Sequence, residues 1–184
     1  PWGKGFPGWH VECSAMSRAY LGQPFDIHTG GIDHIPVHHQ NEIAQSEAAY
    51  GVLLANYWLH SEFVNMGETK IAKSGENFIT LQTLKERGIH PLAYRYYLLQ
   101  AHYRSPISFS WSEVEAAQTS YFKLLHKSSK LSEKGEGFRV SPLYLENLKH
   151  TGDDLNTSRV LSDMWVGLQS PMKITSERDI VLDY

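Results

Sequence analysis

Between residues 25 and 66 the chain places one helical run between two strand-like runs. Phe25–Thr29 alternates apolar and polar side chains, which is typical of a strand of about five residues. Gly30–Gly31 ends this strand. A helix is then expected from Pro36, whose missing N–H is harmless in a first turn, to about Tyr50. A second strand-like run follows over Tyr57–Met66. Strand, glycine turn, helix and strand in this order predict an α/β domain with a parallel sheet.

The pattern becomes helical beyond residue 81. Ser110 and Glu113 have the spacing of a capping box, and apolar residues at helical spacing follow them. The polar stretch Lys127–Arg139 predicts an exposed connection, and a last helix is expected to begin near Asn156. A short helix over Val11–Leu21 is expected before the first strand. We therefore expect an α/β part over residues 1–108 and the start of an α-helical bundle over residues 109–184.

Composition limits the classes of function. The chain has 184 residues, of which 41% are hydrophobic, enough to bury a core. A net charge of −3 excludes a basic nucleic-acid arm but not a local RNA-binding patch. The single cysteine, Cys13, forbids an internal disulfide and fits a reducing compartment, which favours the cytoplasm. Apolar runs stay far below the roughly 18 residues of a membrane span, so no membrane association is expected.

A metal-binding pattern is offered by His38 and Glu42. They lie four residues apart on the expected helix, so both would project from one face about 6 Å apart. Zinc accepts nitrogen, oxygen and sulfur ligands, and Cys13 could supply the sulfur. His34 and His38 form a competing pair at the same spacing, although Pro36 places His34 before the helix. Spacing alone does not separate such pairs from ordinary solvated helix faces.

A second pattern is the loop Lys70–Ser74, which carries two lysines three residues apart. Lysine acts as a mobile point charge for phosphate groups. The two charges alone do not distinguish a phosphate-binding loop from an ordinary solvent-exposed loop.

Taken together, the segments resemble cysteinyl-tRNA synthetases, which are class I aminoacyl-tRNA synthetases with a Rossmann-like catalytic domain. Several motifs match in order along the chain, and the likeness extends to about residue 168. The matching segments are Pro7–Met16, Phe25–Asp33, His38–Glu47, Lys70–Ser74, His102–Pro106 and Asp153–Thr157.

The resemblance implies a role for each matching position. It implies ATP (with Mg²⁺), cysteine and cysteine tRNA as partners, Zn²⁺ as cofactor, a monomer, and a cysteinyl-adenylate intermediate. The implied zinc ligands are Cys13, His38 and Glu42. Trp9 would form the floor of the cysteine pocket and His28 would stand near the amino acid, while the adenosine-binding residues would be Gly30, Gly31 and Asp33. Lys70, Lys73 and Ser74 would stabilise the leaving pyrophosphate.

Some features depart from the family pattern. Gln40 stands where the family often has Glu, and Ile71-Ala72 replaces Met-Ser between the lysines. The chain begins at Pro1, so we expect a fragment whose first zinc cysteine and His-Ile-Gly-His motif lie upstream. Alone, such a fragment is expected to bind zinc weakly or not at all and to be inactive.

Three other functions fit part of this pattern. A cysteine ligase of mycothiol synthesis shares the adenylation site, but the residues around His28 and Asn156 resemble the synthetase more closely. A non-catalytic, synthetase-like RNA-binding protein would not need the lysines and zinc ligands. A zinc hydrolase built on His38 and Glu42 lacks an obvious general base beside the pair.

Overall fold

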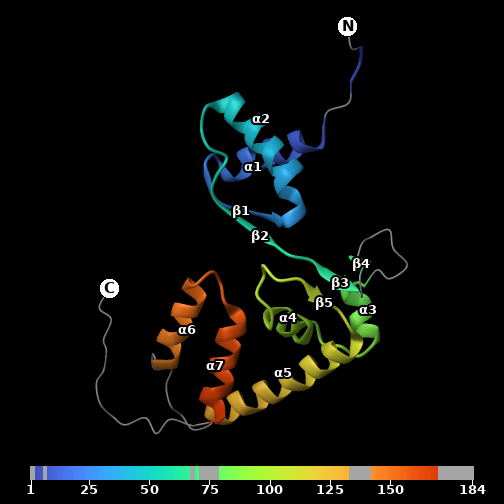
Figure 1. Ribbon diagram of the computed structural model, residues 1–184, viewed down its shortest axis with the longest axis vertical. Coiled ribbons are helices and arrows are strands. Elements are labelled where there is room, and N and C mark those ends of the chain that lie inside the picture. Colours follow the sequence, from blue (N-terminus) through green and yellow to red (C-terminus); the bar gives the residue numbers. More distant parts are fainter. Residues whose placement is uncertain (1–2, 6–7, 67–68, 71–78, 133–141, 170–184) are drawn as a thin grey trace. The chain divides into compact units, whose positions relative to one another are not determined.

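The computed structural model describes residues 3–5, 8–66, 69–70, 79–132 and 142–169 (Figure 1). The chain divides into two compact units, residues 1–78 with 103–109, and residues 79–102 with 110–184. The expected division into 1–108 and 109–184 therefore differs from these units over residues 79–102. These residues group with the helical part because α4 (Pro91–Leu99) packs along α5 (Trp111–Ser132) within the second unit.

The first unit begins with α1 (Trp9–Leu21) and β1 (Phe25–Gly31). A 3₁₀ turn over Ile32–His34 and a π-helical turn over Ile35–His39 then lead into α2 (Gln40–Tyr50).

The C-terminal stop of this helix is formed by Gly51. It adopts φ 68° and donates its N–H to the Glu47 carbonyl at 2.8 Å. Such a left-handed conformation costs glycine little. The predicted end near Tyr50 is confirmed.

The predicted parallel sheet is confirmed by β1 and β2 (Ala55–Ser61). They pair in parallel, with Phe25 opposite Ala55 and Gly30 opposite His60. The single expected strand over Tyr57–Met66 is wrong in extent. Its last part is a separate strand, β3 (Val64–Met66), which pairs with β4 (Thr69–Lys70) and β5 (Ile107–Ser108) instead of β1.

Strand β5 explains why residues 103–109 belong to the first unit. It runs parallel to β3, with Val64 opposite Ile107. The Ile107 N–H donates to the Phe63 carbonyl at 3.0 Å, and the Glu62 N–H donates to the Tyr103 carbonyl at 2.8 Å. Through these backbone bonds residues 103–109 belong to the first unit, although residues 79–102 before them belong to the second.

A small core supports β1 and β2. Phe25, Leu54 and Ala55 are buried together, and Trp58 packs against them. Helix α1 packs on α2, and the buried Ser14 hydroxyl donates to Gln45 Oε1 at 2.9 Å. This bond ties α1 to α2.

The described part of the second unit is helical. In addition to α4 and α5 it holds α3 (Leu81–Glu86), α6 (Pro142–Gly152) and α7 (Thr157–Gln169). The Glu113 N–H donates to Ser110 Oγ at 3.2 Å, which is the first half of the predicted capping box. The connection predicted from Lys127 is wrong at its start, because α5 continues to Ser132. None of the described helices is long and apolar enough to cross a membrane.

The last helix begins near Asn156, as predicted. The Asn156 side chain accepts the Arg159 N–H at 3.3 Å. Thr157 Oγ1 donates to the Leu99 carbonyl at 3.0 Å, and Trp165 Nε1 donates to the Tyr96 hydroxyl at 2.8 Å. These bonds tie α7 to α4. The assignment of this unit as a tRNA-binding bundle stays a prediction.

Candidate functional site

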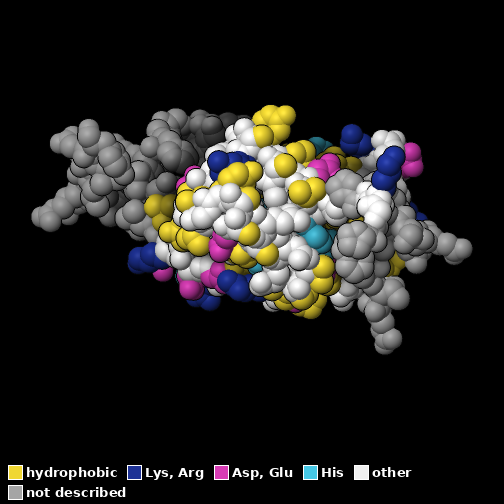
Figure 2. All heavy atoms as spheres, turned by 90° about the horizontal axis from the view of Figure 1, so that it is seen from above, with side chains coloured by type: hydrophobic (Ala, Val, Ile, Leu, Met, Phe, Trp, Pro, Cys, Tyr) yellow, Lys and Arg dark blue, Asp and Glu magenta, His cyan; other side chains and the backbone are white. Residues whose placement is uncertain are grey.

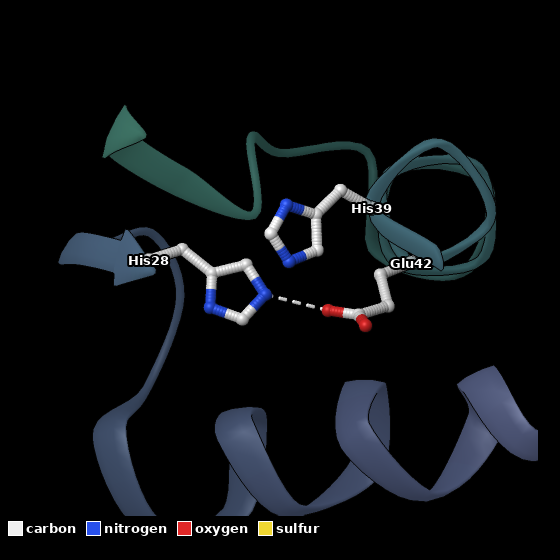
Figure 3. Close-up of side chains that lie close together, drawn as sticks. All are labelled: His28, His39 and Glu42. Atoms are coloured by element: carbon white, nitrogen blue, oxygen red, sulfur yellow. Dashed lines mark hydrogen bonds and ion pairs between the residues drawn. The ribbon is translucent and has the colours of Figure 1, made fainter. Parts of the chain in front are cut away.

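A short contact joins His28 of β1 to Glu42 of α2. His28 Nε2 lies 2.6 Å from Glu42 Oε2, and the Glu42 side chain is only 6% exposed (Figure 3). A buried carboxylate needs a partner, because removing its charge from water costs far more than one hydrogen bond returns. The contact therefore holds the His28 side chain of β1 against the first turn of α2.

His39 completes a group of three potential metal ligands. It is 4% exposed and comes from the turn just before α2. One ligand atom each from His28, His39 and Glu42 lie within 4.8 Å of one another. Figure 3 shows one ring nitrogen of His39 turned toward the contact between the other two side chains. Two imidazoles and a carboxylate are ligands that zinc accepts.

The protonation state of His39 suits this role. Its pKa is lowered to about 4, first by burial and then by the neighbouring histidines. The ring is therefore neutral near pH 7, and a neutral imidazole is the form that binds a metal. Trp58 covers the group, with its ring 4.8 Å from that of His28 and 5.0 Å from that of His39.

Of the three ligands that the resemblance implies, the structure places Glu42 in this group of described residues, but not His38 or Cys13. The His38 ring lies beside those of His10, at 5.0 Å, and His34, at 4.9 Å. Cys13 is exposed on α1. Its pKa is raised by partial burial and then by the negative charges of Glu42 and Glu12, so its thiol lies within electrostatic range of Glu42.

The π-helical turn explains the difference between the two neighbouring histidines. The expectation for His38 assumed an unbroken α-helix from Pro36 to Glu42, in which residues four apart share a face. The structure instead ends the π turn at His39 and begins the α-helix at Gln40. His39 and Glu42 are then three residues apart at the start of α2, and it is His39 that joins the group.

The two glycines of the expected adenosine turn are required by the chain's own side chains. A Cβ at Gly30 would lie 2.7 Å from Cε1 of His39, and a Cβ at Gly31 would lie 2.5 Å from Oδ1 of Asp33. Asp33 also pairs with His34 Nδ1 at 3.3 Å. The glycines therefore make room for these side chains, in addition to any ligand.

Among the described residues, Trp9 is not part of the group. Trp9, the expected floor of the cysteine pocket, is 79% exposed at the start of α1. The backbone of Lys70 belongs to β4. Lys73 and Ser74 lie outside the described residues, so their roles stay predictions.

Two histidines near Glu42 were missed by the sequence reasoning. His39 could have been found from the adjacent pair His38-His39, had both registers been considered. His60 comes from β2, and His39 Nδ1 lies 2.8 Å from its Nε2. Strand pairing across 21 residues brings these rings together, and local spacing carries no sign of it.

Comparison with known proteins first defines the class. The fold resembles a solved structure of LeuRS from Agrobacterium radiobacter, in a ternary complex with tRNA and LeuAMS, with a TM-score of 0.63 and 17% identity over 80% of this chain and 23% of that one. The family model for the class I (C) tRNA synthetase catalytic domain matches residues 1–119. The chain belongs to this family.

Within this family, the similar curated proteins are named as cysteine–tRNA ligases. The chain is 51% identical to "Cysteine--tRNA ligase 1" of Burkholderia lata over 90% of its own length and 35% of the relative. It is 53% identical to "Cysteine--tRNA ligase" of Treponema denticola, over 71% of its length and 26% of the relative. A "Cysteine--tRNA ligase" of Parasynechococcus marenigrum is 41% identical over 97% of the chain and 40% of the relative. The chain thus spans less than half of each relative.

Proposed function

We propose that the full-length protein attaches cysteine to cysteine tRNA through a cysteinyl-adenylate, at the expense of ATP. The observation that carries the proposal is the 51% identity, over nine-tenths of the chain, to a protein named as a cysteine–tRNA ligase. The chemistry of the site is compatible, because polar groups gather at the carboxyl end of a parallel strand, where α/β proteins bind their ligands.

The proposed reaction begins with attack of the cysteine carboxylate on the α-phosphate of ATP, which releases pyrophosphate. Lys70 and Lys73 stabilise the charge that grows on the leaving group, and Ser74 supports their loop. Gly30, Gly31 and Asp33 receive the adenosine. In the second step the cysteinyl group passes to the terminal ribose of the tRNA.

We also propose a zinc ion at this site. The buried Glu42 carboxylate, the imidazoles of His28 and His39 beside it and the nearby Cys13 thiol form a donor set that suits zinc. Cys13, His38 and Glu42 are the ligands proposed from the resemblance, and the geometry adds His39 as a further donor beside Glu42. His28 stands beside them near the amino acid. Zinc, when bound, supplies a soft Lewis acid that binds a thiolate far better than a hydroxyl.

Discrimination between cysteine and serine follows from this donor set. A pocket that differs by one small group separates analogues by only about 1–3 kcal/mol. A zinc ion held by these residues would add a chemical criterion to shape, because it prefers sulfur to a hydroxyl oxygen. Trp9 would close the floor of the pocket. The second unit would bind tRNA, and the protein is proposed to act as a monomer in the cytoplasm.

Exchange of labelled pyrophosphate into ATP tests the proposal. With the full-length protein, exchange should depend on cysteine and should not occur with serine at the same concentration. Absence of exchange with cysteine would favour the non-catalytic RNA-binding alternative. If exchange occurs, cysteine tRNA and the amino-sugar acceptor of mycothiol synthesis are then compared, and transfer to the amino-sugar alone would contradict the assignment.

A further inference from the structure

His60 lies beside the candidate site without belonging to any of the proposed ligand or substrate positions. It sits on β2 directly opposite Gly30 of β1. Because Gly30 has no side chain, the His39 ring can lie against the β1 backbone at this point. The same missing side chain lets the ring approach His60 from the neighbouring strand.

The contact between the two rings is a good hydrogen bond. His39 Nδ1 and His60 Nε2 are 2.8 Å apart, with ring centroids separated by 4.9 Å. One N–H lies between the two rings in such a contact, so the bond holds each ring in a single tautomer, whichever of them donates.

This bond determines which atom of His39 faces the site. An imidazole ring can rotate by 180° about its bond to Cβ, which exchanges Nδ1 with Cδ2 and Nε2 with Cε1. In the observed orientation Nδ1 faces His60, and the other nitrogen faces His28 and Glu42 (Figure 3). The flipped ring would turn Cδ2 toward His60 and Cε1 toward His28 and Glu42. Only the observed orientation makes the bond to His60.

We propose that His60 is a positioning residue, which holds the His39 imidazole with Nε2 directed at Glu42 and His28. The proposal rests on the proposed function for the identity of the metal, but the orientation of the ring does not depend on it. Substitution of a residue that hydrogen-bonds a metal ligand typically weakens metal binding by about 10- to 100-fold.

Two amide substitutions of His60 separate positioning from simple loss of a side chain. In His60→Gln the amide reaches roughly the place of the imidazole Nε2 and can donate or accept, so it can keep the bond to His39. In His60→Asn the shorter side chain places its amide near the former Nδ1, which is too far away. Ser61→Ala, at the exposed next position on β2, is the matched control.

The first readout uses the metal-free, full-length protein with ¹⁵N-labelled histidine. Long-range ¹H–¹⁵N correlation spectra should show one predominant tautomer for His39 in the wild type, in His60→Gln and in Ser61→Ala. In His60→Asn the two nitrogen shifts should move toward the average of both tautomers. Unchanged shifts in His60→Asn would overturn the proposal, whether or not the protein activates cysteine.

The second readout is zinc affinity, measured by competition with a chelating indicator. His60→Asn should bind zinc about 10- to 100-fold more weakly, while His60→Gln should stay within about threefold of the wild type. Equal weakening in both variants would overturn the positioning role. Failure of the wild type to bind zinc would contradict the proposed function and leave the first readout as the test of this inference.

Discussion

Adding one methyl group at Gly30 should disturb the candidate site more than its size suggests. In Gly30→Ala the new Cβ would lie 2.7 Å from Cε1 and 2.9 Å from Nε2 of His39, and 3.3 Å from Cβ of His34. Ordinary contact begins near 3.4 Å, so the His39 ring must retreat by about 0.7 Å. Trp58 and the 2.8 Å bond to His60 restrict that retreat.

Overpacking of this kind costs about 1–3 kcal/mol. We expect the free energy of opening β1 to fall by that amount, and zinc affinity to fall with it because His39 moves. Native-state hydrogen exchange of the β1 and β2 amides is the suitable assay, since it reports the opening of each part of the chain separately. The spectra of His39 described above would show the displaced ring directly.

The matched control is Gly152→Ala at the end of α6. It adds the same methyl group where nothing lies within 4 Å. The α6 amides should keep their protection or gain up to about 1 kcal/mol, because alanine restricts the unfolded chain. If Gly30→Ala leaves β1 within about 0.5 kcal/mol of the wild type and the His39 signals unmoved, the steric reasoning is refuted.

Three further outcomes are expected. Cys13→Ser should abolish zinc retention in the full-length protein, measured by metal analysis after dialysis, and unchanged zinc content would remove Cys13 from the ligand set. Lys73→Ala should reduce cysteine-dependent pyrophosphate exchange by about 100-fold or more, with binding of cysteine retained, if the lysine acts on the leaving group. Asn156→Ala should destabilise α7 by about 1 kcal/mol, because the acceptor of the Arg159 N–H is lost. Asn156→Ser supplies another acceptor and should keep most of the wild-type stability of α7. Hydrogen exchange of the α7 amides would measure the stability of this helix. Equal protection in the alanine and serine variants would argue against Asn156 as its N-terminal cap.

The pH dependence of zinc binding should not come from His39. Its pKa is lowered to about 4, so the ring is already neutral over the usual working range. The Cys13 thiol behaves differently, because its pKa is raised and metal binding must displace its proton. We expect the zinc affinity of the wild type to rise with pH toward the thiol pKa. An affinity independent of pH between 6 and about 8 would contradict this.

Much of the first unit could be predicted from the chain alone. The Gly51 stop, the helix near Val11–Leu21 and the two parallel strands follow from turn residues and from apolar periodicity, which act over a few residues. The family likewise follows from motifs read in order. These features are local, so a linear pattern is sufficient to express them.

The structure alone decided which side chains meet at Glu42. A π turn places His39, rather than its neighbour His38, in the described group, and strand pairing brings His60 to the same ring from 21 residues away. The assignment of residues 79–102 to the helical unit is also a matter of packing. The sequence therefore determined the local elements and the chemical inventory. The contacts between elements depended on register and long-range packing, which no spacing within one segment encodes.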